Sequence, residues 1–420
     1  MATPHKLTAD QAVSFIHNLP KMQRTNSLKN IKLVLDQLEN PQNKVKTIHV
    51  TGTNGKGSTC YYLSHLLTAT NQKVGLFISP FIIQFNERIQ INNQPISNKE
   101  LVELVEIIRP VLARISDQQP EFVITEFEFV TVLGYLAFAK NQVDYAIIEV
   151  GIGGEHDKTN VITPELSIIT SIGMDHQALI GPTLADITTE KVGIIKSTRP
   201  VVIGHVPKVI RPIIQKRIRE QHADSYWLNQ QFNVAQQVIK TQHQVYSNIK
   251  SVANVEQIDM AIAIQAYELL VAKLLTPKEV VEVLNSVQIP ARYQLVHKGP
   301  DIIVDGAHNV AAVKELKKYL ASHYPDKTKV TILTAIMKDK DYRGIFNLLA
   351  DYKIKVTTID NPRAAKQTDF AQLDFKNLTY IEDYVAYIKQ WLQQARPTDT
   401  LIICGSFYFA SEVIKFFNKN

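Results

Sequence analysis

The segment from Thr51 to Ser58 carries the clearest chemistry in this chain and reads Thr-Gly-Thr-Asn-Gly-Lys-Gly-Ser. Its glycines let the backbone turn tightly and aim N–H groups at phosphate oxygens. Lys56 supplies a full positive charge, and the Ser58 hydroxyl suits Mg²⁺. A helical pattern follows the segment, so a helix dipole would add positive charge at the same point. We therefore predict a nucleoside triphosphate site with these contacts: Thr53, Asn54, Gly55, Lys56, Gly57 and Ser58.

The spacing inside this segment narrows the class of nucleotide site. The common phosphate loop reads G-x-x-x-x-G-K-[ST], whereas here Gly57 separates Lys56 from Ser58. This variant favours a smaller group of ligases over nucleotide hydrolases in general. The alternative is a glycine-rich turn between a strand and a helix with no ligand. We favour the phosphate site, because the lysine and the serine fall where phosphate and magnesium need them.

Two other polar residues follow apolar, strand-like segments. Glu149 ends the segment Tyr145–Val150, where a carboxylate would lie beside the phosphate-loop crevice and hold Mg²⁺ directly or through water. His176 follows the segment Leu166–Thr170 and could act as a ligand or as an acid or base. The alternatives are a glutamate that caps a loop and a histidine with a structural role. Imidazole is an uncommon Mg²⁺ ligand, so the residue type alone does not assign His176 to a metal.

Polar residues also gather in Asp305-Gly-Ala-His-Asn309, which follows another apolar segment. The Asp305 carboxylate could accept hydrogen bonds from ribose hydroxyls. His308 and Asn309 could contact phosphate or cap the next helix, and Asn309 is a credible N-cap. By contrast, Glu190 and Lys191 fall on a predicted helix, where the residues alone favour a solvated ion-pair face.

Length and composition limit the class of protein. A chain of 420 residues is too long for one ordinary core, so we expect two domains. With 45% hydrophobic and 20% charged residues, the chain is typical of a soluble globular protein. Cys60 and Cys404 lie far apart in apolar segments, which predicts buried free thiols and a cytoplasmic location. A net charge of +6 without a dense basic and aromatic cluster argues against nucleic acid, and no apolar run is long enough to span a membrane.

Strand-like and helix-like segments alternate along the chain, which predicts an α/β fold with a mostly parallel sheet. The expected strands of the first domain are Lys46–Thr53, Lys73–Ser79, Asp144–Gly151, Leu166–Thr170 and Pro200–Gly204. The expected helices are Ala9–His17, Ser27–Glu39, Lys99–Ile115, Glu126–Lys140, Leu184–Ile195, Val209–His222, Glu256–Leu270 and Pro277–Val287. Short alternation from Tyr226 to Lys250 indicates an antiparallel excursion.

A second and smaller α/β series begins after Gly299-Pro300, and we place the domain boundary between residues 295 and 296. Its expected strands are Ile302–Gly306, Lys329–Ala335, Lys355–Ile359 and Thr400–Gly405. Its expected helices are Asn309–Ser322, Ile345–Tyr352 and Ile381–Gln394. This pattern is typical of a Rossmann-like unit, but the segment lacks G-x-G-x-x-G, so we infer no dinucleotide.

A set of motifs in this chain resembles the folylpolyglutamate synthase/dihydrofolate synthase family, a branch of the Mur ligase superfamily. The motifs are T-G-T-N-G-K-G-S (Thr51–Ser58), F-I-S-P (Phe77–Pro80), N-E-R-I (Asn86–Ile89), E-V-G-I-G-G (Glu149–Gly154), D-x-T-N (Asp157–Asn160), I-G-M-D-H (Ile172–His176), E-K-V-G-I-I-K (Glu190–Lys196), D-G-A-H-N (Asp305–Asn309) and C-G-S (Cys404–Ser406). They occur in family order over nearly the whole length, and their combination is highly specific. The resemblance implies an ATP-binding phosphate-loop domain, residues 1–295, and a Rossmann-like ligase domain, residues 296–420.

The resemblance also implies roles for individual residues. The catalytic residues would be Lys56, His176 and Lys191, with Lys191 carbamylated so that its negative charge helps to place a second metal. The Mg²⁺ ligands would be Ser79, Glu149 and His176. The ATP contacts outside the phosphate loop would be Asp259, Arg292, Asp305 and His308. The acceptor would lie against Thr125, Glu126, Phe127, Glu128, His156, Asp157 and Lys158.

The implied reaction is ATP-dependent amide formation. The γ-phosphoryl group passes to a carboxylate of a folate or of dihydropteroate, and the α-amine of L-glutamate then displaces phosphate. Lys56, the metal and Arg292 would contribute positioning and charge neutralisation. The resemblance implies a monomer whose partners are these small molecules, with no nucleic acid and no membrane.

The chain departs from the family pattern near the acceptor and the adenine. Phe81 replaces the histidine of S-P-H, Glu155 the arginine of G-G-R, and Asp259 the asparagine of H-Q-x-x-N. The main alternative is therefore a divergent paralogue that binds ATP with an altered acceptor or little ligase activity. A peptidoglycan-precursor Mur ligase is disfavoured, because the 50 residues before Thr51 are too few for the UDP-binding domain of that class.

Overall fold

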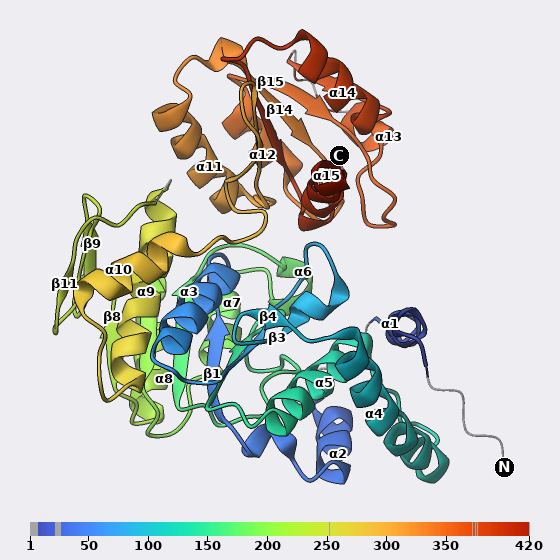
Figure 1. Cartoon of the computed structure of the whole chain (residues 1–420), viewed down its shortest axis with the longest axis vertical. Helices are drawn as coiled ribbons and strands as arrows, with labels where there is room; N and C mark the ends of the chain where they lie inside the picture. Colours follow the sequence, from blue (N-terminus) through green and yellow to red (C-terminus); the bar gives the residue numbers. More distant parts are fainter. Residues whose placement is uncertain are drawn as a thin grey trace. The chain divides into compact units, whose positions relative to one another are not determined.

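The computed structural model describes residues 7–21, 27–251, 253–371, 373, 375 and 377–419. The chain divides into two compact units, residues 1–287 and 288–420 (Figure 1). Each unit is an α/β sheet with helices packed on it, which confirms the predicted fold class. The division falls a few residues before the boundary expected from the sequence. Strand β12 (Gln294–His297) explains the difference, because it pairs with β13 (Asp301–Val304) of the second unit.

The first unit is built on an eight-stranded sheet in the order β4-β3-β2-β5-β1-β6-β7-β8. Its strands are β1 (Lys46–Thr51), β2 (Val74–Phe77), β3 (Ile89–Ile91), β4 (Gln94–Pro95), β5 (Tyr145–Glu149), β6 (Leu166–Ser171), β7 (Val201–His205) and β8 (Ser225–Trp227). The pairings from β2 to β8 are parallel, and β3 and β4 add an antiparallel edge. The carboxyl ends of β5, β1 and β6 are therefore neighbours, as expected for a ligand crevice.

Helices pack on this sheet in groups (Figure 1). They are α1 (Ala9–His17), α2 (Lys29–Gln37), α3 (Lys56–Ala69), α4 (Asn98–Gln118), α5 (Glu126–Lys140), α6 (Gln177–Ile180), α7 (Leu184–Val192), α8 (Arg211–Glu220), α9 (Asn254–Leu270) and α10 (Pro277–Ser286). Short 3₁₀ turns lie at Pro41–Asn43, Phe85–Arg88 and Lys208–Ile210. α3 packs against α9 and α10, while α1, α2, α4 and α5 share one apolar core. α7 and α8 pack over β6, β7 and β8 in a second core.

The predicted antiparallel excursion is only partly right. β9 (Asn233–Ala235), β10 (Val238–Lys240) and β11 (Val245–Tyr246) form a separate antiparallel sheet. The prediction is wrong at Tyr226, which lies in β8 and pairs in parallel with β7. The β3–β4 hairpin was not predicted. Its turn places Asn92 and Asn93 at φ values of 50° and 63°, a left-handed conformation that asparagine tolerates.

The second unit holds a six-stranded sheet in the order β12-β13-β17-β14-β15-β16. The strands after β13 are β14 (Val330–Thr334), β15 (Lys353–Val356), β16 (Leu378–Tyr380) and β17 (Thr400–Cys404), all paired in parallel. The helices are α11 (Val310–His323), α12 (Tyr342–Leu349), α13 (Gln367–Ala371), α14 (Tyr384–Gln394) and α15 (Phe407–Lys419), and a 3₁₀ turn covers Lys327–Lys329. β12, β16, α13 and α15 were not predicted. Cys60 and Cys404 are buried free thiols, as expected. Among the described helices, none has the length and apolar character needed to cross a membrane.

Candidate functional site

The loop between β1 and α3 is shaped by two glycines that leave no room for a side chain. Gly55 is the N-cap of α3 with φ of 85°, and a Cβ there would collide with the Asp259 carboxylate. A Cβ on Gly52 would overlap the Thr170 hydroxyl at the end of β6. The loop and the first turn of α3 thus form a backbone cradle that fits a phosphate chain.

The end of β6 holds this loop in place. Thr53 N–H donates to Ser171 O at 2.8 Å, and Asn54 N–H donates to Ser171 Oγ at 2.9 Å. The Thr170 hydroxyl donates to Asn54 O at 2.6 Å. These bonds join motifs more than a hundred residues apart in the sequence, so the shape of the loop is fixed by the chain itself.

Two lysines converge on one carbonyl of the loop. Lys56 Nζ donates to Gly52 O at 3.0 Å, and Lys191 Nζ donates to the same oxygen at 2.9 Å. Burial lowers the pKa of Lys191 to about 7, and the nearby charge of Lys56 acts in the same direction. Lys191 therefore carries a substantial neutral fraction near neutral pH, which an exposed lysine does not. This reverses the interpretation of Lys191 as part of a solvated face.

A cavity beside the loop gathers the three residues predicted to be catalytic, Lys56, His176 and Lys191. The complete lining is Thr51, Gly52, Thr53, Lys56, Val150, Gly151, Ile152, Gly153, Asp175, His176, Ile180 and Lys191. The phosphate loop, the segments after β5 and β6, and α7 thus meet at one place. The predicted loop contacts Asn54, Gly55, Gly57 and Ser58 continue from this cavity into the first turn of α3.

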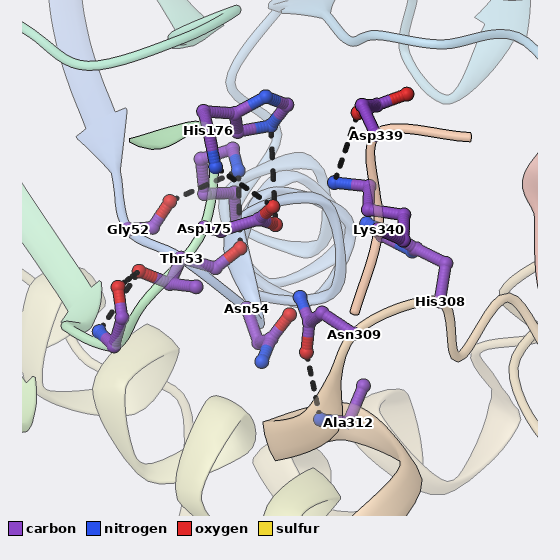
Figure 2. Close-up of polar contacts among 12 residues, drawn as sticks. Gly52, Thr53, Asn54, Asp175, His176, His308, Asn309, Ala312, Asp339 and Lys340 are labelled. Atoms are coloured by element: carbon purple, nitrogen blue, oxygen red, sulfur yellow. Dashed lines mark hydrogen bonds and ion pairs between the residues drawn. The ribbon is translucent and has the colours of Figure 1, made fainter. Parts of the chain in front are cut away.

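His176 lies on the segment between β6 and α6 and has φ of 51° (Figure 2). Asp175 Oδ1 accepts the backbone N–H of His176 at 2.9 Å, and Asp175 Oδ2 lies 3.9 Å from His176 Nε2. The His176 side chain is 30% exposed. The ring is therefore partly accessible, and the Asp175 carboxylate lies beside it.

The predicted metal residues Ser79 and Glu149 lie together. Glu149 Oε2 accepts the Ser79 N–H at 3.0 Å, and a Cβ on Gly57 would stand 3.7 Å from the same oxygen. The glycine spacer thus lets the phosphate loop approach Glu149, with Ser58 next in sequence. Carboxylate and hydroxyl oxygens are donors that Mg²⁺ prefers, so these residues fit that ion. Over the described ranges, no group of three or more His, Cys, Asp or Glu side chains is arranged to hold a metal.

Asp259 lies on α9 and is buried beside Gly55. The structure thus places this predicted ATP contact at the phosphate loop. A carboxylate replaces the neutral asparagine of the family pattern at this position. A negative charge here would oppose the charge of a triphosphate bound at the loop.

Three predicted acceptor residues are bonded to one another at the start of α5. Thr125 caps the helix: its Oγ1 accepts the Glu128 N–H at 3.3 Å and donates to Glu128 Oε2 at 2.9 Å. Glu128 is fully buried, and its Oε1 lies 3.4 Å from Lys158 Nζ. Lys158 also donates to Ser27 O at 2.7 Å. The structure therefore joins Thr125, Glu128 and Lys158 through contacts that the chain makes with itself.

Glu126 and Phe127 have different neighbours. Burial raises the pKa of Glu126, but hydrogen bonds from His17 and Lys21 outweigh burial and lower the pKa to about 2. The Phe127 ring lies against Gly151, where a Cβ would collide with it. Phe127 thus contacts the segment that lines the cavity, whereas Glu126 ties α5 to the N-terminal segment.

His156 and Asp157 also diverge. His156 Nδ1 lies 2.6 Å from Glu190 Oε1, so the residue before Lys191 is tied to the glycine-rich segment. Asp157 is buried, and burial raises its pKa, while hydrogen bonds from Thr159 and backbone N–H groups act against that shift. Neither residue belongs to the cavity lining.

The two departures from the family pattern near the acceptor have partners of their own. Glu155 Oε2 lies 3.7 Å from an Arg217 nitrogen, and the charges of Glu155 and Lys196 also interact. The Arg88 guanidinium lies 5.2 Å from the centroid of the Phe81 ring. The negative charge that replaces an arginine is therefore balanced by basic side chains.

Two of the three predicted nucleotide residues of the second unit, Arg292 and His308, contact Phe407. The Arg292 guanidinium lies 4.9 Å from the centroid of the Phe407 ring, and the His308 ring centroid lies 5.6 Å from it. A Cβ on Gly306 would collide with the same ring. Phe407 therefore packs against both Arg292 and His308 within this unit.

Asp305 and Asn309 complete this part of the second unit. Asp305 accepts N–H bonds from Tyr293 at 3.0 Å and from Ala307 at 2.8 Å. Burial raises the pKa of Asp305, while Arg292 acts to lower it. Asn309 Oδ1 accepts the Ala312 N–H at 2.8 Å, so Asn309 is the N-cap of α11, as expected (Figure 2).

Two residues that contact these groups, Asp175 and Phe407, were not predicted from the sequence. Asp175 lies inside the motif that contains His176, and Phe407 directly follows Cys404-Gly-Ser. Each adjoins a motif already singled out, so a search for acidic and aromatic neighbours of the motifs would have found both. Asp175 contacts the adjacent His176, whereas the contacts of Phe407 with Arg292 and His308 depend on tertiary packing and have no local sequence signal.

Comparisons with known proteins cover nearly the whole chain. Residues 50–268 match the Mur ligase middle domain, and residues 291–407 match the Mur ligase glutamate ligase domain. Folylpolyglutamate synthase of Lacticaseibacillus casei is 35% identical over 96% of this chain and 97% of the relative. Dihydrofolate synthase/folylpolyglutamate synthase of Bacillus subtilis is 32% identical over 96% and 98%.

Solved structures agree with these matches. The apo form of L. casei FPGS has a TM-score of 0.87 at 32% identity and covers 98% of this chain and 100% of its own. An FPGS-AMPPCP-folate complex has a TM-score of 0.87 at 32% identity, covering 98% and 99%. Mycobacterium tuberculosis folylpolyglutamate synthase complexed with ADP has a TM-score of 0.90 at 26% identity, covering 98% of both chains.

Proposed function

The chain belongs to the folylpolyglutamate synthase family of Mur ligases, and we propose that it joins L-glutamate to a folate carboxylate in an ATP-dependent reaction. The observation that carries this proposal is the cavity in which Lys56 and Lys191 converge on Gly52 O beside the glycine cradle. The FPGS-AMPPCP-folate complex of a relative supports ATP and a folate as substrates. The Bacillus subtilis relative is also named a dihydrofolate synthase, so dihydropteroate is a second acceptor to test.

The reaction proceeds in two steps, phosphorylation of the acceptor carboxylate and displacement of phosphate by the amine. A carboxylate oxygen of the acceptor attacks the γ-phosphorus of ATP, the bond to the β–γ bridging oxygen breaks, and ADP leaves. The α-amine of glutamate then attacks the acyl carbon, the amide forms, and phosphate departs with the original carboxylate oxygen. One amine proton is released in this step. Activation is needed because a carboxylate is a poor electrophile.

Residues of the chain contribute positioning and charge neutralisation. The cradle around Gly52 and Gly55 binds the phosphates through backbone N–H groups, and Lys56 neutralises their charge. Ser58, Ser79, Glu149 and His176 are the proposed Mg²⁺ site, and that ion would supply further charge neutralisation at the phosphates. Arg292, Asp305, His308 and Asp259 remain proposed nucleotide contacts.

Lys191 is the proposed site of carbamylation. Only a neutral amine attacks CO₂: the nitrogen lone pair forms an N–C bond, and one proton leaves to give a carbamate anion. The pKa of about 7 supports this, because it leaves the amine partly neutral near neutral pH. The carbamate would place a negative charge beside Gly52 O and Lys56, where it can help to bind a second cation.

A divergent ATP-binding paralogue is the second candidate, and Asp259 is the observation that favours it. A buried carboxylate beside Gly55 weakens triphosphate binding compared with a neutral amide. This candidate predicts ATP binding with no amide product from any folate or dihydropteroate. We also propose that the protein is a monomer and is located in the cytoplasm.

An isotope-transfer experiment tests the proposed reaction. The acceptor carboxylate is labelled with ¹⁸O, and the released inorganic phosphate is examined by mass spectrometry. Direct activation predicts one ¹⁸O in each phosphate that accompanies amide formation. Amide formation with unlabelled phosphate would rule out the acyl phosphate route.

A further inference from the structure

A buried chain of polar groups runs from β1 to the segment that lines the cavity. His49 lies on β1 and is fully buried, and its Nε2 is 2.8 Å from Thr159 Oγ1. The Thr159 hydroxyl is hydrogen-bonded in turn to Asp157 Oδ1, which also accepts the Thr159 N–H at 3.0 Å. Asp157 Oδ2 accepts the Ile152 N–H at 2.9 Å.

The direction of these bonds follows from the donors available. The Asp157 carboxylate accepts backbone N–H groups on both oxygens, so the single Thr159 hydroxyl proton is donated to Asp157. Thr159 Oγ1 must then accept from His49 Nε2–H. This assigns the His49 tautomer and leaves Nδ1 as a bare acceptor, buried and without a hydrogen-bond partner among the described residues. Burial also lowers the pKa of His49 to about 3, which keeps the ring neutral.

This chain of polar groups ends at the backbone of the glycine-rich segment. Gly151, Ile152 and Gly153 line the cavity that also holds Lys56 and Lys191. A second bond holds this segment to β1, because Thr51 Oγ1 donates to Gly153 O at 2.6 Å. The segment is therefore tied to the strand that leads into the phosphate loop at two points, His49 and Thr51.

We propose that His49 is a positioning residue, which acts through Thr159 and Asp157 to fix the backbone of Gly151–Gly153 relative to the phosphate loop. The role rests on the proposed ligase function, since the positioned backbone lines the cavity where phosphoryl transfer would take place. This role also revises the expectation for Asp157. Both of its oxygens accept hydrogen bonds within this chain of polar groups, so its contribution to acceptor binding is indirect. A small displacement of this backbone would misalign the transferred group and lower kcat.

Two variants each remove one hydrogen bond from this chain of polar groups, and a third variant preserves the bond made by residue 49. Thr159→Val removes the hydroxyl with little change in shape, and His49→Phe keeps a ring without a donor. His49→Gln keeps an N–H donor close to the position of Nε2. We expect kcat to fall at least about tenfold in the first two variants, with the KM for ATP changed less than about threefold, and to recover in His49→Gln. The double variant His49→Phe with Thr159→Val should lose no more kcat than the more damaging single variant, because both substitutions act on the same chain of polar groups.

Amide hydrogen exchange of the peptide containing Ile152 provides a second readout that needs no activity. We expect faster exchange at Ile152 in Thr159→Val and His49→Phe, and protection close to wild type in His49→Gln. If the wild type forms no amide product, the proposed function fails, while this exchange pattern still decides the role of His49. Unchanged exchange and unchanged kcat in Thr159→Val would overturn the proposal. Thr159→Val decides alone if His49→Phe disturbs folding, and a fall in melting temperature with normal kcat would show a merely structural role.

Discussion

Lys191 offers a quantitative test of how burial shapes the cavity. Its pKa falls from 10.5 to about 7 in the folded chain, chiefly because the ammonium is buried. Between these two pH values the unfolded chain binds more protons at this site than the folded chain. The free energy of unfolding therefore rises with pH across that window. From pH 7 to pH 9 the rise from this group is about 2 kcal/mol, at about 1.36 kcal/mol for each pH unit of full proton difference.

The assay compares Lys191→Met with its parent by urea unfolding at pH 7 and pH 9. Both chains carry Trp391→Phe, so that the fluorescence of Trp227 reports on the first unit alone. Buffers are depleted of CO₂ to keep the amine free. We expect the parent to gain about 2 kcal/mol more than Lys191→Met between the two pH values. Lys216→Met is the matched control, because that side chain is 74% exposed and should change nothing.

An equal pH response of parent and Lys191→Met would mean that Lys191 keeps its ordinary pKa and that burial does not lower it. A larger gain in Lys191→Met would refute the sign of the pKa shift. Mass measurement after adding bicarbonate tests carbamylation separately. We expect a mass increase of one CO₂ in the parent and no such increase in Lys191→Met.

The remaining predictions address the loop, the second unit and the acceptor residues. Gly55→Ala should weaken ATP binding at least about tenfold, because φ of 85° and the Asp259 carboxylate both exclude a Cβ; Gly57→Ala, where a Cβ meets Glu149 only at 3.7 Å, should lose less by calorimetry. Equal losses would contradict this account. Phe407→Leu should raise the KM for ATP about two- to fivefold through loss of the contact with Arg292, and Phe407→Tyr should preserve it; no difference between them in steady-state kinetics would argue against that contact. Glu128→Gln should lower the melting temperature and raise the KM for folate, because it leaves Lys158 without its buried counter-charge, while the KM for ATP stays constant. A change in the KM for ATP alone would show that the pair does not serve the acceptor.

Much of the phosphate site could be predicted from the sequence, because its geometry is local. The glycines, Lys56 and Ser58 lie in one short segment between a strand and a helix, and the fold confirms that arrangement. Glu149 could be placed nearby because parallel strands end at the same edge of a sheet. β1 does pair with both β5 and β6, so this prediction needed only the strand order.

The environment of Lys191 could not be predicted, because it depends on a contact with Gly52, 139 residues away. On α7 the residue looked like one half of a solvated ion pair, and only packing against the loop buries it. Glu155 is similar: it lies in the loop after β5, and its balancing partner Arg217 lies on α8. The contacts of Phe407 with Arg292 and His308 likewise arise from tertiary packing within the second unit.

Following isotopically labelled L-glutamate into product tests directly whether this chain joins glutamate to an acceptor carboxylate. The purified chain is incubated with ATP, Mg²⁺ and either a reduced folate or dihydropteroate, and Lys56→Ala is run in parallel. We expect a glutamylated product with one ADP formed for each amide, and loss of nearly all product in Lys56→Ala. ATP binding without product from either acceptor, or full activity in Lys56→Ala, would contradict the proposed function.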